Sequence, residues 1–134
     1  VENLVLMANY AYLDAEFTDG ELNGYELAYA PESTFSVGAN FDHQFLGGTL
    51  NWFAVYNYTD DFYHDAGNGS EEDAYGLLNA RVGYTPTDGN WELALAGDNL
   101  TDEDYGAYRG DPGLGEVIHW GYKRMVRAEF NIYF

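Results

Sequence analysis

Cysteine is absent from this sequence of 134 residues. The absence excludes disulfide bridges, thiolate metal sites and a cysteine nucleophile. The sequence also lacks any apolar run of the roughly 20 residues that a membrane-spanning helix needs, which excludes a helical membrane protein. It does not exclude a membrane β-barrel, because barrel strands alternate apolar and polar residues and give only a weak hydropathy signal.

Basic residues are also scarce, with 5 Lys and Arg against 23 Asp and Glu, for a net charge of −18. Such an acidic chain is a poor partner for nucleic acid, whose binding requires basic groups for the phosphates. Tyr, Phe, Trp and Gly are abundant, at 13, 8, 3 and 16 residues, while Pro occurs only 3 times. Many aromatic residues and glycines, in alternating runs, favour β structure with many turns.

Six segments alternate apolar and polar residues with a period of two, which predicts strands and not helices. In residues 34–45, for example, Phe35, Val37 and Ala39 alternate with Ser36 and Gly38. The six predicted strands are residues 3–17, 34–45, 49–62, 75–86, 91–101 and 120–134.

The connections between these segments alternate strictly in length. Residues 46–48 and 87–90 make short turns, whereas residues 18–33, 63–74 and 102–119 make long polar loops. All long loops therefore lie at one end of the predicted sheet, as in a transmembrane barrel with short periplasmic turns and long extracellular loops. Aromatic residues gather near the strand ends, where a membrane barrel carries its aromatic girdles.

These patterns predict an all-β fold, a segment of an antiparallel up-and-down transmembrane β-barrel. Six strands are too few to close such a barrel, since the smallest have about eight. We therefore expect the two outer strands to pair with strands beyond this sequence. A soluble lipid-binding β-barrel, apolar inside and polar outside, is the alternative that the alternation alone leaves open.

Two stretches resemble a known family. The run "NARVGYTPTDGNWELALAGDNLTDEDY" (residues 79–105) and the ending "RMVRAEFNIYF" look like the C-terminal end of TonB-dependent outer-membrane receptors. The upstream runs "YAYLDAEFTDG" and "ELAYAPESTFSVGANF", within residues 10–41, resemble the preceding part of the same family. One departure is Lys123 before Arg124, where the family often has proline. Because of this departure, the resemblance does not determine the residue at which the last strand begins.

The resemblance implies a barrel of about 22 strands filled by a plug domain. Residues 1–134 would be the C-terminal segment of that barrel, with the plug domain and TonB box absent from the sequence. The implied function is TonB-dependent uptake of a scarce nutrient, such as a ferric siderophore, across the bacterial outer membrane. The alternative is a passive pore or a structural barrel subunit.

The resemblance also implies a set of partners. They are the rest of the same barrel and its plug domain, the TonB energy-coupling complex, the barrel assembly machinery of the outer membrane, and lipid or lipopolysaccharide. Phe134, the terminal aromatic residue, is the implied assembly signal.

Two loops carry candidate binding residues. In residues 102–119, Tyr105, Tyr108, Arg109 and His119 have side chains that stack on a ligand or pair with a carboxylate or catecholate oxygen. Packing between neighbouring loops is the plainer interpretation of the same residues. In residues 59–75 a weak cation candidate comprises acidic residues whose spacing does not match an EF-hand: Asp61, Asp65, Glu71, Glu72 and Asp73.

Other polar residues lead to structural expectations. His64 has no second histidine nearby and is expected to be exposed, since a lone histidine is a poor metal site. Charged residues on the polar face of the strands are expected to face the barrel lumen and form cross-strand pairs: Arg81, Glu92, Asp98, Arg127 and Glu129. The sequence shows no GxSxG, HExxH or phosphate-loop motif, so we expect neither enzyme activity nor a cofactor.

Overall fold

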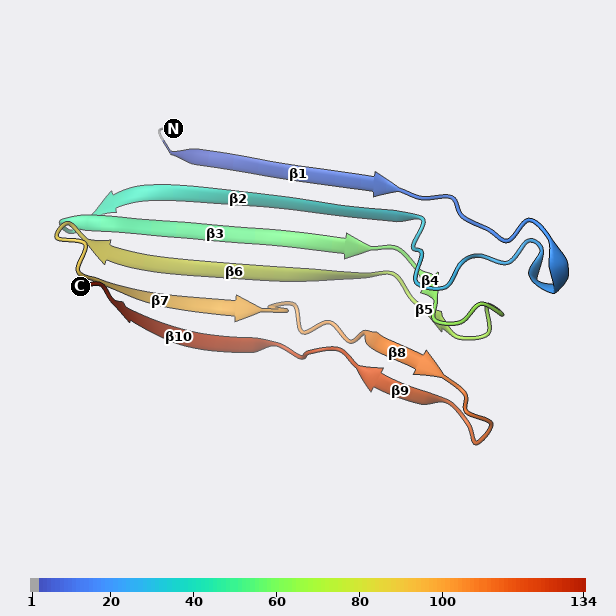
Figure 1. Ribbon diagram of the computed structural model, residues 1–134. Helices are drawn as coiled ribbons and strands as arrows, with labels where there is room; N and C mark the ends of the chain where they lie inside the picture. Colours follow the sequence, from blue (N-terminus) through green and yellow to red (C-terminus); the bar gives the residue numbers. More distant parts are fainter. Residues whose placement is uncertain (1–2) are drawn as a thin grey trace.

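Six long strands form one antiparallel sheet in the computed structural model, which describes residues 3–134. Each strand pairs with the next long strand in the chain, so the sheet is an up-and-down meander in the order β1-β2-β3-β6-β7-β10 (Figure 1). The strands are β1 (Leu4–Tyr12), β2 (Ser33–Phe45), β3 (Gly48–Thr59), β6 (Tyr75–Pro86), β7 (Trp91–Asp98) and β10 (Met125–Ile132).

The two ends of the sheet differ in the length of their connections. The turns β2–β3 and β6–β7 lie at one end, together with the start of β1 and the end of β10, and the three long loops extend from the other (Figure 1). The two short turns also touch, since the Thr87 backbone N–H donates to the Gly47 carbonyl oxygen over 3.0 Å. The alternation of connection lengths expected from the sequence therefore places every long loop at the same end.

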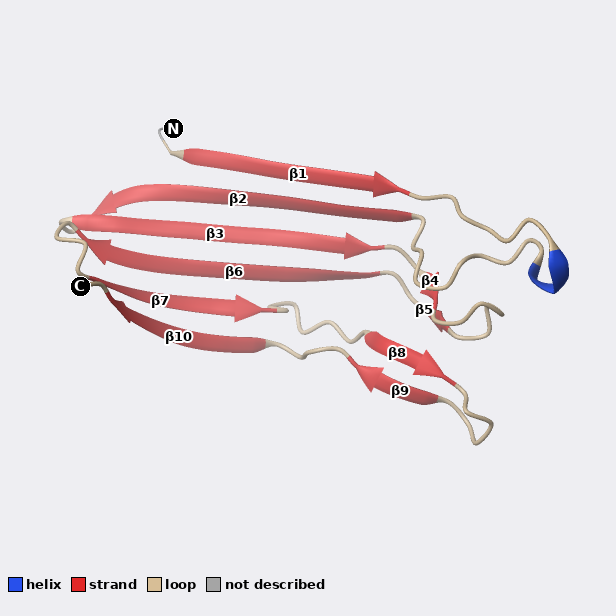
Figure 2. Cartoon of the chain, in the orientation of Figure 1, coloured by secondary structure: helices blue, strands red, loops and turns tan. Residues whose placement is uncertain are grey.

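Two of the long loops contain short hairpins that the alternation did not predict (Figure 2). Strands β4 (Phe62–Tyr63) and β5 (Glu71–Glu72) pair within one loop, and β8 (Gly106–Gly110) and β9 (Val117–Trp120) pair within the other. The third loop contains a single 3₁₀ turn, Gly20–Leu22. No helix within residues 3–134 is long and apolar enough to cross a membrane.

Four of the predicted strands were too long at their loop ends. The third ends at Thr59 and not at residue 62. The first ends at Tyr12 and not at residue 17, and Leu13 continues as a loop whose N–H bonds to the Glu32 carbonyl oxygen over 2.8 Å. The fifth ends at Asp98, because Asn99 has a φ of 48° and cannot continue a strand. The last begins at Met125, and Trp120 belongs instead to the loop hairpin β8–β9.

The strand register places like residues side by side on each face of the sheet. One cross-strand row reads Leu4, Phe41, Trp52, Val82, Leu95 and Ala128, and all six belong to one face. The next row belongs to the opposite face and reads Val5, Asn40, Phe53, Arg81, Ala96 and Arg127. Because successive residues point to opposite faces, the period-two pattern becomes one apolar face and one largely polar face.

Within residues 3–134, no layer packs on the apolar face. Leu6 is 73% exposed, Val126 is 65% exposed and Phe130 is 63% exposed. The buried apolar residues of the described chain are only Phe62, Ala94 and Ala96, of which Phe62 lies in a loop. An exposed apolar surface of this extent marks contact with a membrane or with another apolar surface.

The β2–β3 turn is a two-residue hairpin in which both central residues have positive φ, 46° at Leu46 and 72° at Gly47. This geometry matches a type I′ turn, which suits the twist of the flanking strands. The left-handed region costs an ordinary L-residue roughly 1–2 kcal/mol, whereas asparagine tolerates it well. Leu46 therefore holds an unfavourable backbone conformation with a side chain that is 82% exposed.

We predict that Leu46→Asn stabilises the protein by about 1 kcal/mol, because asparagine relieves the backbone strain at this position. The free energy of unfolding, from a denaturant titration of the full-length protein, provides the measurement. Leu46→Ala is the control, since it removes the exposed side chain but keeps a residue that disfavours positive φ. Equal stabilisation by both variants would show that the backbone conformation is not the cause.

Candidate functional site

Side chains from all three long loops meet in one cluster beyond the ends of the strands, in which Phe62, His64 and Glu72 are buried. This loop cluster consists of Tyr29, Phe62, His64, Glu72 and Arg109. Tyr29 comes from the loop after β1, the next three residues from the loop between β3 and β6, and Arg109 from β8. The cluster brings together residues as far as 80 positions apart in the sequence, and it joins the three loops.

Glu72 is the most deeply buried charged residue of the described chain, with 2% of its surface exposed. Its two carboxylate oxygens accept hydrogen bonds from another loop: the Gly106 backbone N–H donates over 2.7 Å and the Arg109 Nε–H over 2.5 Å. A buried carboxylate is tolerated only when it is paired and hydrogen-bonded, and Glu72 meets both conditions. The same hydrogen bond raises the pKa of the Arg109 guanidinium above its ordinary value.

His64 lies beside Glu72, with Nε2 at 3.6 Å from the Glu72 Oε2 and none of its side chain exposed. Its ring packs against Tyr29, Phe62 and Tyr108, at centroid distances of 5.2, 5.0 and 6.2 Å. Neither ring nitrogen has a hydrogen-bond partner within residues 3–134. The expectation that His64 is exposed was wrong, because the loops fold over it instead of extending into solvent.

Backbone contacts fasten the first loop to the second. The Tyr29 N–H donates to the Tyr63 carbonyl oxygen over 2.8 Å. The Asn68 side chain bonds twice to the backbone of Glu26, accepting its N–H over 2.8 Å and donating to its carbonyl oxygen over 3.1 Å. Tyr29 has a φ of 57°, so a bend in the first loop directs it into the cluster.

The predicted ligand-binding residues of the last loop have different environments. Tyr108 is 46% exposed and packs edge-on against the exposed His119, with 5.9 Å between ring centroids. Tyr105 is half-buried and stacks on Tyr75 at 4.6 Å. Arg109 is paired with Glu72 and lies over the Trp120 ring at 5.8 Å. Tyr108 and His119 thus form one accessible surface, whereas Tyr105 and Arg109 pack within the loops.

The acidic residues of the cation candidate do not come together. Asp61, Glu71 and Asp73 are exposed, Glu72 is buried against Arg109, and no cluster of metal-ligating residues occurs in the described part of the chain. Asp65 organises a turn instead: its carboxylate accepts the backbone N–H groups of Gly67, Gly69 and Ser70 over 2.7–3.3 Å.

Asn99, the first residue of the run "NLTDEDY", has a structural role. It is 4% exposed, and its side-chain amide donates to the carbonyl oxygens of Glu103 and Tyr122 over 2.9 Å each. Its oxygen accepts the Glu103 N–H over 2.9 Å, and its own N–H donates to the Asn79 side chain over 2.9 Å. Asn99 therefore fixes the path by which the chain leaves β7 and returns to β10. The sequence run identifies this position, but its several partners are visible only in the fold.

The five charged residues predicted to face the lumen form one network on the polar face of the sheet. Arg81 contacts Glu92 at 3.0 Å and Glu129 at 3.1 Å. Arg127 contacts Glu129 at 2.9 Å and also pairs with Asp98. Because two arginines are shared among three carboxylates, the network joins β6, β7 and β10 and leaves one net negative charge.

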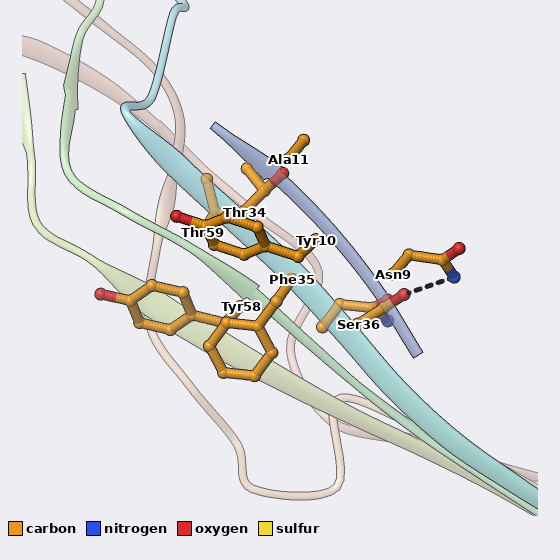
Figure 3. Close-up of a pocket in the computed structure, with 9 residues that line it drawn as sticks. Asn9, Tyr10, Ala11, Thr34, Phe35, Ser36, Tyr58 and Thr59 are labelled. Carbon is orange, nitrogen blue, oxygen red and sulfur yellow. Dashed lines mark hydrogen bonds between the residues drawn. The ribbon is translucent and has the colours of Figure 1, made fainter. Parts of the chain in front are cut away.

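Near the loop end of the sheet, aromatic side chains line a shallow hollow of about 320 Å³ on β1, β2 and β3 (Figure 3). Phe35 and Tyr58 stack with 4.9 Å between ring centroids, and Tyr10 lies in the same cross-strand row. The opposite face at this height is polar, with Asn9 donating to the Ser36 hydroxyl over 3.2 Å. An aromatic row at a strand end, on the apolar face, is the arrangement expected where a membrane barrel meets the interface.

Comparison with known proteins identifies the family. Residues 3–100 match the family model described as "TonB dependent receptor-like, beta-barrel". The chain belongs to this family. The antiparallel meander with all long loops at one end is the barrel wall of a TonB-dependent receptor, as the sequence resemblance implied.

Two solved structures share the fold. The ferric yersiniabactin uptake receptor FyuA from Yersinia pestis aligns with 100% of this chain, at a TM-score of 0.93 and 21% sequence identity. BauA, the ferric preacinetobactin receptor from Acinetobacter baumannii, aligns with 97% of it, at a TM-score of 0.75 and 24% identity. The chain corresponds to 22% and 19% of the length of these two proteins.

The Asp65 turn leads to a prediction about how the stability of this turn depends on pH. Burial alone would raise the pKa of Asp65, but the backbone N–H groups of Gly69, Ser70 and Gly67 outweigh it and lower the pKa below the ordinary value of 3.8. The ionised carboxylate is the form that accepts these bonds. Its contribution is therefore fully present above pH 3.8 and is lost only as the pH falls through the lowered folded-state pKa.

We expect Asp65→Asn to loosen residues 65–70 at neutral pH by about 1–2 kcal/mol, because the amide is a poorer acceptor than the carboxylate. Amide hydrogen exchange of this segment measures the effect, and wild-type protection should persist down to pH 4. Asp61→Asn, at an exposed position of the same loop, is the control. Loss of wild-type protection between pH 7 and 5 would contradict the assignment.

Proposed function

We propose that residues 1–134 form the C-terminal wall of an outer-membrane receptor barrel of about 22 strands that encloses a plug domain. The observation that carries the proposal is the two-faced sheet: one face exposes large apolar side chains, and the other carries the Arg81–Arg127 charge network. The apolar face suits contact with lipid and lipopolysaccharide. The charged face suits contact with a plug domain inside the barrel.

The free strand edges support the same proposal. Within residues 3–134, β1 pairs on one side only, with β2, and β10 pairs on one side only, with β7. A strand edge without a partner is unfavourable in lipid, because its backbone groups find no water. We infer that further strands of the same barrel complete both edges, and that Phe134 is read by the machinery that assembles outer-membrane barrels.

The proposed activity is TonB-dependent uptake of a scarce nutrient of the ferric-siderophore type. The two structurally similar proteins are described as receptors for ferric yersiniabactin and ferric preacinetobactin. We propose that Tyr108 and His119 offer the accessible part of a ligand surface, as exposed rings suited to stacking on an aromatic siderophore. The TonB energy-coupling complex would act through parts of the receptor that precede these strands.

The orientation of the sheet can be tested with neighbouring residues on β2. Phe41 belongs to the apolar face and Asn40 to the polar face. We predict that Phe41→Arg destabilises the folded barrel by about 2–4 kcal/mol, the cost of arginine on a lipid face. Asn40→Arg should be tolerated, because Asp42 lies two residues along the same face. The folded fraction, from heat-modifiable migration in gel electrophoresis of outer membranes, provides the measurement, and similar effects of both variants would contradict the orientation.

The transport function is tested by uptake in cells that lack other siderophore receptors and express the full-length protein. Iron-labelled yersiniabactin and preacinetobactin complexes are the first two probes. We expect TonB-dependent uptake of at least one such ferric complex, reduced several-fold in the double variant Tyr108→Ala and His119→Ala. Leu114→Ala, at an exposed position in the same hairpin, is the control. Uptake that is independent of TonB would favour the passive pore.

A further inference from the structure

We propose that Glu72 is a positioning residue that locks the last two loops together, and that Arg109 holds the β8–β9 hairpin through Glu72 instead of contacting an imported ligand. The loop packing is independent of the proposed function; only its consequence for uptake rests on that function. The proposal assigns Arg109 a role that differs from the ligand contact expected from the sequence.

The first step is that two of the three Arg109 guanidinium nitrogens are already engaged within the loops. Its Nε–H donates to Glu72 over 2.5 Å, and its Nη1 lies 3.4 Å from a Glu116 carboxylate oxygen. Its guanidinium carbon lies 5.8 Å from the centre of the Trp120 ring, within the range of a cation–π interaction. These contacts connect β8 to β5 on one side and to β9 on the other, so Arg109 fixes the position of the hairpin.

The second step is that Glu72 cannot remain buried without the last loop. With 2% of its surface exposed, its charge is compensated by the Arg109 guanidinium and the Gly106 N–H, both from that loop. Removing one partner of such a pair leaves an uncompensated buried charge, which is strongly unfavourable. The loop that contains Glu72 and the loop that contains Arg109 therefore stay in contact, or Glu72 leaves its buried position.

The third step is that the lock determines where the accessible rings lie. Tyr108 precedes Arg109 in β8 and belongs to the opposite side of the hairpin, where it contacts both His64 and His119. When Glu72 is paired with Arg109, the Tyr108 ring packs against His64. The relative positions of Tyr108 and His119 are then fixed. When the lock opens, His64 becomes accessible and the Tyr108–His119 surface loses its support.

The test uses the accessibility of His64 in the full-length protein. Diethyl pyrocarbonate modifies exposed imidazoles, and peptide mass spectrometry separates His64 from the exposed His119, which serves as the internal reference. In the wild type we expect His64 to react far more slowly than His119. Glu72→Gln and Arg109→Met should each increase the modification of His64 by about tenfold or more, and should increase amide exchange in residues 106–120.

Two further variants distinguish a lock from a general loss of stability. Glu71→Gln changes the adjacent, exposed carboxylate of the same strand and should leave His64 protected. The double variant Glu72→Gln with Arg109→Met should protect His64 better than either single change, because it removes both charges of the pair while glutamine still accepts the Gly106 N–H. Additive effects, or protection of His64 in either single variant, would overturn the proposal.

Uptake of the same ferric complexes separates this inference from the proposed function. If Arg109 acts through Glu72, both single variants lower uptake to a similar degree and the double variant recovers part of it. A loss of uptake in Arg109→Met that the double variant does not recover, while His64 stays protected, assigns Arg109 to the ligand and overturns the proposal. Absence of uptake in the wild type contradicts the proposed function but leaves the labelling result unaffected.

Discussion

Antiparallel register is the constraint on which the rest of the molecule depends. In a sheet of six strands, each long strand is aligned to the next by backbone hydrogen bonds, and a slip of one residue would exchange the two faces. The two short turns, Leu46–Gly47 and Thr87–Asn90, fix this register at one end of the sheet. The difference between the apolar face and the polar face follows from it, since within residues 3–134 neither face has a packed layer of its own.

The same register assembles the charge network. Arg81, Glu92 and Glu129 come from three different strands and are adjacent only because β6, β7 and β10 pair in this order. Pairs of this kind are individually modest when they are exposed to water. Shared among five side chains of three strands, they form one connected network on the polar face of the sheet.

At the other end of the sheet, side-chain contacts hold the loops in place. Aromatic packing and one buried carboxylate act there together with two short hairpins and single backbone hydrogen bonds, and the loop cluster connects segments that the long sheet does not align. The pairing of Glu72 with Arg109 is specific because each would be costly to bury alone. In this chain the pair joins the last two long loops to each other.

Local sequence was sufficient for the six long strands, the alternation of connection lengths and the family, because period-two patterning and turn residues depend on neighbouring positions. It did not predict the two loop hairpins. That five charged residues share the polar face was also recognisable, since strand phase alone assigns a face; that this face lines a lumen stays a prediction. The strand ends next to the long loops could not be predicted in the same way. Asn99, for example, ends a strand early through a positive φ that its buried hydrogen bonds stabilise. The burial of His64, the pairing of Glu72 and the engagement of Arg109 depend on contacts between loops far apart in the chain, and only the tertiary structure decides those.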